Sequence, residues 1–193
     1  MEITSSQYDL HVTFTTPVLG SQPTIAVASE FIAKRAGLED LPDDEARMLP
    51  EELERGTTVF HRMADGSHSL IDYQIKGFLK EAGSVFNGKL GVKNLRSKLD
   101  NYVFITPRVI KLNIAGEMTY LERPLRAMTA QGPRVSLARS EMLPEGTSFT
   151  CHIRVIESEI SVGLLCALLD YGAMKGLGQW RNGSYGQFTY ELK

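Results

Sequence analysis

The sequence is poor in residues that build disulfide, metal or redox sites. Of its 193 residues, only two are cysteine. Cys151 and Cys166 lack Cys-x-x-Cys spacing and fall in apolar periodic segments, so we expect buried free thiols rather than a disulfide. Paired cysteines, His-x-x-x-His spacings and Asp-x-Asp clusters are also missing. The sequence therefore predicts no metal site and no cofactor.

Long hydrophobic runs are missing as well. No stretch approaches the roughly 20 apolar residues that a membrane-spanning helix needs, so we expect no membrane contact. The N-terminal segment MEITSSQYDL has no basic region followed by an apolar one, which predicts no signal peptide and, by elimination, a cytoplasmic location. A hydrophobic fraction of 42% is ordinary for a globular protein, and we expect one domain over residues 1–193.

The net charge is small, but the charged residues are unevenly distributed. The formal net charge is −2, which alone argues against a non-specific nucleic-acid binder. Residues 1–75 carry 5 Lys or Arg against 13 Asp or Glu, whereas residues 76–139 carry 12 against 4. This segregation favours one basic face and a largely acidic insertion over residues 22–66, with helices over 24–36 and within 38–56. The alternative is that folding interleaves these segments and their fields cancel.

Hydrophobic periodicity predicts an α+β fold. Leu10, Val12 and Phe14 alternate with polar residues as in a half-buried strand, and residues 70–82 have the apolar spacing of a helix. The expected elements after that helix are a basic stretch (89–98), an extended segment broken at Pro107 (102–114), a long loop or hairpin carrying four arginines (123–139), a strand (149–155), a helix capped by Gly172 (160–171) and a last strand (187–192). This order is close to the ferredoxin-like βαββαβ layout, which RNA-recognition motifs share.

Two features of this chain are candidates for binding an anion. On the expected helix, Lys76 and Lys80 are four residues apart and share a face. Between them Gly77 costs roughly 1 kcal/mol relative to alanine, which the close approach of another backbone or a ligand would explain. The second feature is the loop from Lys175 to Gly186, which holds four glycines together with aromatic, basic and amide side chains.

Glycines let a backbone approach a phosphate closely, and Trp180 or Tyr185 would stack on a base beside Arg181. The loop follows a helix and precedes a strand, which is the reverse of the order around a dinucleotide-binding loop. It also lacks the Lys-Ser/Thr ending of a loop that binds nucleoside triphosphates. The structural alternative is a tight helix-to-strand connection with Trp180 in the core.

Several segments, in the same order, resemble the RAMP superfamily, the ferredoxin-like RNA-binding proteins of CRISPR systems. The segment VTFTTPVLGS (12–21) resembles the family's first strand and its Gly-Ser exit, and YQIKGFLKEA (73–82) its first helix. The segment EGTSF (145–149) matches the entry to the penultimate strand, and residues 176–186 resemble the C-terminal glycine-rich loop. Within the superfamily, the similarity is greatest to the backbone subunits that coat guide RNA. The phrase GLGQWR (176–181) also looks like proteins of phages and prophages.

The resemblance implies a non-catalytic binder of RNA or single-stranded DNA that self-associates into an oligomer or filament. A projecting hairpin is expected within residues 112–133. The residues expected to contact nucleic acid are Lys76, Lys80, Arg123, Arg126, Arg134, Gly178, Gln179, Trp180, Arg181, Asn182 and Tyr185. The chain departs from the family at the start of this helix, which reads Asp72-Tyr73-Gln74 where the family has Gly-Ser-Ser. The carboxylate of Asp72 would repel a phosphate there unless it caps the helix.

Two other functions compete with this one. Some RAMP proteins cut RNA without a metal, and here His61, His68, Asp65 and Asp72 are the candidate acids and bases, since a histidine of near-neutral pKa suits in-line attack by a 2′-hydroxyl. They lack the family's Gly-Gly-x-Asp context. The other alternative is a phage-borne mimic that engages the subunits of a host CRISPR effector complex through its acidic residues 38–56.

Overall fold

The computed structural model describes residues 5–24, 57–129, 132–156 and 159–193. The chain divides into two compact units. The first comprises residues 1–18, 61–117 and 143–193, and the second comprises residues 19–60 and 118–142. The two helices expected over residues 24–36 and 38–56 lie outside the described residues, apart from Thr24. No helix among the described residues is long and apolar enough to cross a membrane.

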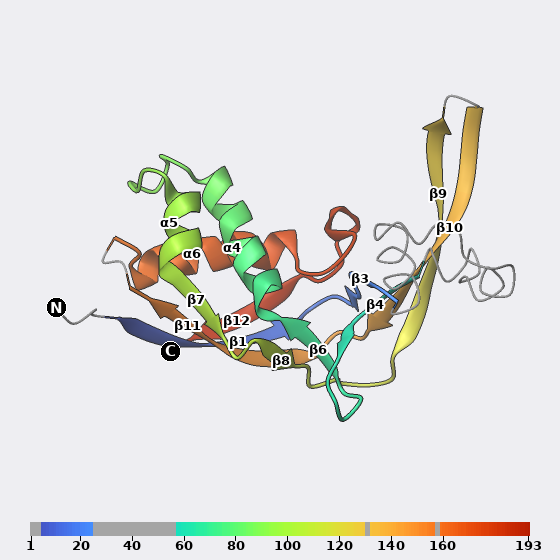
Figure 1. Cartoon of the computed structure of the whole chain (residues 1–193), viewed down its shortest axis with the longest axis horizontal. Coiled ribbons are helices and arrows are strands. Elements are labelled where there is room, and N and C mark those ends of the chain that lie inside the picture. Colours follow the sequence, from blue (N-terminus) through green and yellow to red (C-terminus); the bar gives the residue numbers. More distant parts are fainter. Residues whose placement is uncertain (1–4, 25–56, 130–131, 157–158) are drawn as a thin grey trace, which may run out of the picture. The chain divides into compact units, whose positions relative to one another are not determined.

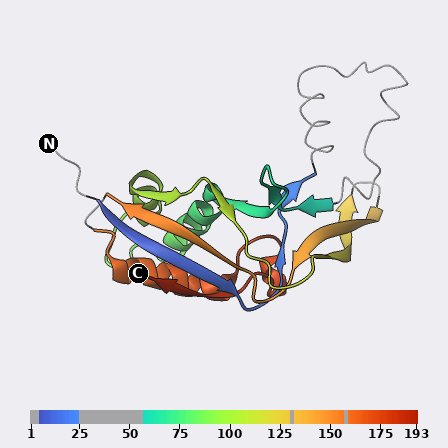
Figure 2. The same cartoon turned by 90° about the horizontal axis from the view of Figure 1, so that it is seen from below.

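The first unit is built on a four-stranded antiparallel sheet with the strand order β12-β1-β11-β7. Its strands are β1 (Ser6–Phe14), β7 (Val103–Thr106), β11 (Ser148–Val155) and β12 (Phe188–Leu192). The predicted strands over 149–155 and 187–192 are thereby confirmed. Figure 2 shows β1 and β11 side by side, and Cα partners run from Ser6 with Val155 to Thr13 with Ser148.

Three helices lie on one face of this sheet (Figure 1). They are α4 (Asp72–Val85), α5 (Leu95–Tyr102) and α6 (Val162–Lys175). The alternating pattern of β1 explains this arrangement, because Leu10, Val12 and Phe14 are each 1% exposed beneath the helices. Cys151 is buried and Cys166 partly buried, both as free thiols, and burial raises the pKa of Cys151 to about 12.

A smaller antiparallel sheet extends the first unit, with the order β5-β6-β8. Its strands are β5 (His61–Arg62), β6 (His68–Ile71) and β8 (Val109–Lys111). The extended segment predicted over 102–114 is thus divided at Pro107 into β7 and β8, as its proline requires. The predicted helix starts at Asp72 because the two preceding apolar residues belong to β6.

The second unit holds a five-stranded sheet, in which the order is β2-β10-β4-β3 and β9 pairs with β10. Its strands are β2 (Val18–Leu19), β3 (Gln22–Pro23), β4 (Thr57–Val59), β9 (Thr119–Thr129) and β10 (Gly132–Leu143). The strands β9 and β10 form a long antiparallel hairpin. A hairpin was predicted within residues 112–133, and the one observed extends ten residues further along the chain.

The sequence analysis leaves out one helix, and its expectation for the end of another helix is wrong. The basic stretch over residues 89–98 contains the start of α5, a helix that was not predicted. Gly172 does not cap the helix α6, which continues to Lys175 and ends at Gly176, where φ is +87°. Close packing accounts for the glycine at position 172 instead, since a Cβ there would lie 2.1 Å from Cε2 of Phe78.

Candidate nucleic-acid interface

The glycine-rich loop is closed at its base by main-chain contacts. Leu177 N–H donates to the oxygen of Gly186 at 2.9 Å, and Gly186 N–H donates to the oxygen of Pro17 at 2.9 Å. A Cβ on Gly186 would lie 1.9 Å from the Leu177 oxygen, and one on Gly176 would lie 2.4 Å from the Tyr185 oxygen. These two glycines therefore allow the chain to approach itself closely. Between them Leu177 is buried, and residues 180–185 form a half-buried to exposed tip.

At this tip, Trp180 stacks on Tyr185, with ring centroids 5.2 Å apart and planes inclined by 18°. Trp180 is 43% exposed, so the alternative that placed its ring in the core is wrong. The main chain of Trp180 has φ +53°, the left-handed region that costs a bulky residue about 1 kcal/mol or more. This conformation begins the short 3₁₀ turn η1 (Arg181–Gly183).

The tip is tied to both neighbouring helices. The guanidinium of Arg181 pairs with the carboxylate of Glu81 on α4 at 2.7 Å, and Lys175 on α6 donates to the amide oxygen of Asn182 at 2.9 Å. Gly178, with φ +83°, and Gln179 lead into Trp180. The structure thus gathers six of the predicted contact residues, 178–182 and 185, into one loop. Whether they bind nucleic acid stays a prediction.

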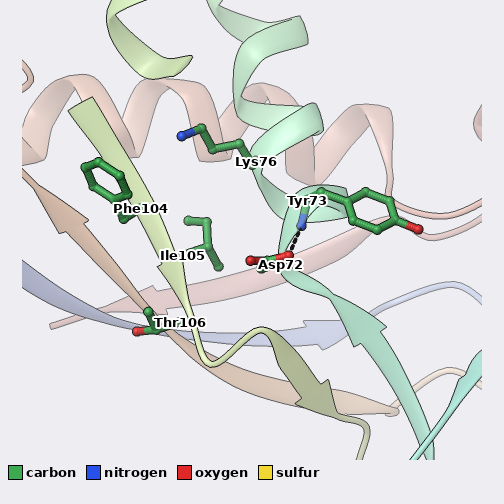
Figure 3. Close-up of a pocket in the computed structure, with 6 residues that line it drawn as sticks. All are labelled: Asp72, Tyr73, Lys76, Phe104, Ile105 and Thr106. Carbon is green, nitrogen blue, oxygen red and sulfur yellow. Dashed lines mark hydrogen bonds between the residues drawn. The ribbon is translucent and has the colours of Figure 1, made fainter. Parts of the chain in front are cut away.

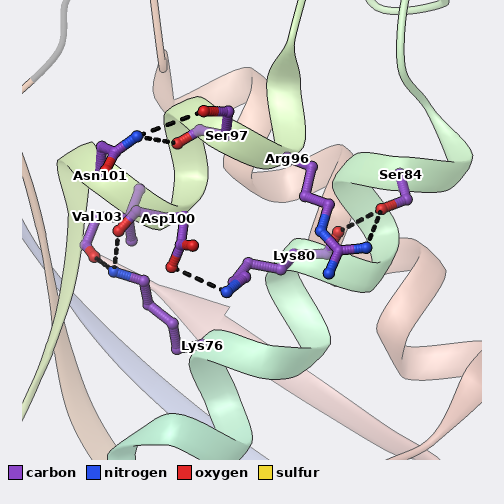
Figure 4. Close-up of polar contacts among 8 residues, drawn as sticks. All are labelled: Lys76, Lys80, Ser84, Arg96, Ser97, Asp100, Asn101 and Val103. Atoms are coloured by element: carbon purple, nitrogen blue, oxygen red, sulfur yellow. Dashed lines mark hydrogen bonds and ion pairs between the residues drawn. The ribbon is translucent and has the colours of Figure 1, made fainter.

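Lys76 and Lys80 face α5 rather than open solvent (Figure 4). The ammonium of Lys76 donates to the main-chain oxygens of Asp100, at 2.7 Å, and of Val103. Burial is the main cause that lowers the pKa of Lys76. Lys80 forms an ion pair of 2.9 Å with the Asp100 carboxylate, and this contact lowers the pKa of Asp100. Any phosphate at this helix competes with these internal acceptors.

A pocket of about 290 Å³ opens between the first turn of α4 and the strand β7 (Figure 3). Its lining residues are Asp72, Tyr73, Lys76, Phe104, Ile105 and Thr106. Asp72 accepts a 2.7 Å hydrogen bond from the Tyr73 N–H, so its carboxylate satisfies one free donor of the first turn, although the N-cap residue is Ile71. The Lys76 ammonium lies 5.2 Å from the centre of the Phe104 ring. The carboxylate makes this pocket a poor place for a phosphate.

The other predicted arginines belong to the second unit. In the β9–β10 hairpin, Arg123 is opposite Ala138, Arg126 opposite Val135 and Arg134 opposite Ala127. The side chains of Arg126 and Arg134 are outside the described part of the structure. The predicted contact residues are therefore divided between the two units.

Three of the four candidate acid–base residues share the hairpin formed by β5 and β6. His61 Nδ1 is 2.8 Å from the hydroxyl of Ser69, and His68 Nδ1 accepts from Arg62 at 3.0 Å. Because His61 pairs with Ser69 and Arg62 with His68 in the register, the two histidines lie on opposite faces of the hairpin. A general acid and a general base must converge on one bond, and this hairpin does not bring the two histidines together.

Asp65 is used by the turn that joins β5 and β6. Its carboxylate accepts from the Ser67 N–H at 2.9 Å and from the Ser67 hydroxyl, and these bonds lower its pKa to about 2. Within the described residues, no group of three His, Cys, Asp or Glu side chains is placed to hold a metal ion.

Sequence reasoning missed a polar groove between α4 and α5. Its lining residues are Ser84, Asn87, Asn94, Arg96 and Ser97. The only signal in the sequence is the absence of acidic residues from Ala82 to Leu99, where four Lys or Arg occur.

Comparison with known proteins places the fold. No protein-family model matches the chain, and no curated protein sequence matches it. A chain of the type III-B Cmr-beta structure bound to cognate target RNA is similar with a TM-score of 0.57 and 14% identity, over 97% of this chain but only 60% of that one. A chain of a type IV-B CRISPR complex is similar with a TM-score of 0.52 and 13% identity, over 97% of this chain and 90% of that one. The protein thus shares an α+β fold with chains from these two assemblies.

Proposed function

We propose that this protein binds single-stranded RNA as a non-catalytic, RAMP-type subunit. The observation that carries the proposal is the stack of the exposed Trp180 on the half-buried Tyr185 at the tip of the glycine-rich loop. Exposed aromatic rings offer a π-face to any base, and a neighbouring arginine adds charge for the backbone. Arg181 supplies that charge, 30% exposed and held beside the rings by Glu81.

The proposal includes a ferredoxin-like core for the first unit. Its support is the succession β1, α4, β7, β11, α6, β12 in a sheet of order β12-β1-β11-β7, with α5 added before β7. Two strand–helix–strand units interleaved in this way define the βαββαβ pattern. The β9–β10 hairpin, which the second unit carries between β8 and β11, fits the projecting hairpin of the RAMP-type backbone subunits.

RNA is preferred to DNA as the ligand, and assembly into a larger complex is part of the proposal. Its support is the likeness to chains of two multi-subunit assemblies, one of them bound to target RNA. The absence of cleavage is supported by the opposite orientation of His61 and His68.

The proposal is tested by a mobility-shift titration of labelled, unstructured 20-mers of RNA and DNA at two salt concentrations. Trp180→Ala should weaken binding by about 5- to 100-fold, the range for loss of one stacked base. Met174→Ala is the matched control, because Met174 is apolar and 70% exposed at the end of α6 but outside the loop. Absence of any single-strand binding by the wild type at low salt would overturn the proposal.

Two further measurements cover assembly and cleavage. Size-exclusion chromatography with and without RNA should show a larger species with RNA. Incubation of the protein with labelled structured RNA in EDTA should leave the RNA intact. If the RNA is cleaved, and His61→Ala or His68→Ala abolishes the cleavage, the protein is a metal-independent ribonuclease and not a non-catalytic binder.

A further inference from the structure

Three cationic side chains, Lys76, Lys80 and Arg96, lie between α4 and α5, and each has a different kind of hydrogen-bond acceptor. At one end Lys76 is held by carbonyl oxygens and Lys80 by the Asp100 carboxylate. At the other end the exposed Arg96 has one hydrogen-bond acceptor among the described side chains, the hydroxyl of Ser84 at 3.5 Å (Figure 4). A guanidinium has five N–H donors. Most of the donors of Arg96 therefore have no acceptor among the described residues.

Beside Arg96, the surface is hollowed into a groove of about 490 Å³. Two amides, two hydroxyls and one guanidinium line it, from Ser84, Asn87, Asn94, Arg96 and Ser97. None of these side chains carries negative charge or is apolar. The groove thus offers several hydrogen-bond donors to an anion.

The segment of the chain that supplies the groove residues is basic. Residues 82–99 contain Lys89, Lys93, Arg96 and Lys98 and no acidic residue. Among the described residues, only Lys98 of these four has a carboxylate partner, Glu159. The nearest acid of α5, Asp100, is already paired with Lys80. Among the described residues, Lys89, Lys93 and Arg96 therefore form no ion pair with a carboxylate, and Arg96 interacts with Asp100 only at longer range.

Close packing holds the two walls of the groove in place. A Cβ on Gly83 of α4 would lie 2.5 Å from Leu99 Cδ1 and 3.3 Å from the main-chain nitrogen of Arg96. Leu95 and Leu99 of α5 are fully buried. A site formed by rigid, packed elements loses little entropy when it binds.

We propose that this groove binds a phosphate group of the nucleic-acid backbone, as a second contact besides the aromatic tip of the glycine-rich loop. The inference rests on the proposed function. The helix α4 connects the two places, since Glu81 holds Arg181 and Ser84 lines the groove. An acidic protein is a poorer match, because protein interfaces centre on aromatic and aliphatic side chains and none of the residues that line this groove is of that type.

The test is the salt dependence of RNA binding by Arg96→Gln in the full chain. Removing one phosphate contact should weaken binding about tenfold and reduce the slope of log K against log salt by about 0.7 for a single strand. Lys98→Gln is the matched control, two residues along the same helix and already paired with Glu159, and it should keep the wild-type slope. Melting curves check that both variants fold.

The outcomes separate the two proposals. If the wild type binds RNA but Arg96→Gln keeps its affinity and slope, the groove is not a phosphate site, while the proposed function stands. If the wild type binds no RNA at low salt, both fail. If polyglutamate binds the wild type more tightly than RNA of similar charge does, and Arg96→Gln loses only the polyglutamate binding, the groove is a site for acidic protein, and the nucleic-acid assignment is overturned.

Discussion

The ammonium of Lys76 donates a 2.7 Å hydrogen bond to the main-chain oxygen of Asp100, so a lysine of α4 satisfies a free carbonyl in the last turn of α5. The same ammonium donates to Val103 at the start of β7. It thereby joins a helix, the end of a second helix and an edge strand. The spacing of Lys76 and Lys80 on one helix face suggested that they bind phosphate. The positive charge of Lys76 is instead held by acceptors inside the protein.

Replacing Lys76 by methionine should therefore lower stability more than replacing Lys80. We expect Lys76→Met to lower the free energy of unfolding by about 1–3 kcal/mol, because two carbonyls lose a charged donor and a helix end loses a cation. Lys80→Met removes only a half-exposed ion pair, which contributes about 0–1 kcal/mol. Urea denaturation measures both. Equal, small losses would mean that the inward contacts of Lys76 do not hold in solution.

Two glycines on facing helices should respond to alanine in opposite directions. Gly172→Ala should lower the free energy of unfolding by about 1–3 kcal/mol, because its Cβ would overlap the Phe78 ring. Gly77→Ala should raise it by up to about 1 kcal/mol, because Gly77 is exposed on α4 with no described atom within 4 Å of the new Cβ. If Gly77→Ala stabilises the protein yet weakens RNA binding, a ligand approaches the helix there. Stabilisation of both variants would contradict the packing at Gly172.

Much of the fold was predictable because the periodicity of the strands is strong. The alternation of Leu10, Val12 and Phe14 with polar residues predicts a strand buried on one face, and β1 is buried on that face. The helix α5 was missed for a local reason. It has eight residues, and it starts after Asn94, whose left-handed main chain gives no side-chain cap. Neither length nor capping pattern distinguishes such a segment from a basic loop.

The candidate site was predictable in its residue types but not in its contacts. The loop composition indicated Trp180 and Tyr185 without deciding between an exposed stack and a buried ring. The partner of Arg181 is Glu81, one hundred positions away in the sequence. Such a pairing depends on how α4 packs beside the loop, and no local pattern records it.

The turn between β5 and β6 should resist acid to an unusual extent. Hydrogen bonds from Ser67 lower the pKa of Asp65 from its ordinary value of 3.8 to about 2. Because the folded value is the lower one, the stabilisation is complete above about pH 4 and is lost as the pH falls through 2. The carboxyl chemical shift of Asp65, followed by NMR, should show a midpoint near 2. A midpoint near 3.8 would mean that the Ser67 contacts are not formed.

Glu81 should act as an internal competitor for nucleic acid. Its carboxylate accepts from Arg181 at 2.7 Å, so a phosphate that binds this guanidinium must first displace it. Glu81→Gln keeps the side-chain volume and removes the competing charge, and it should tighten RNA binding several-fold. Arg181→Gln should instead weaken binding and reduce the salt slope by about 0.7. Fluorescence anisotropy with a labelled 20-mer measures both. If Glu81→Gln weakens binding as much as Arg181→Gln does, the ion pair serves only to hold the loop, and Arg181 does not contact the strand.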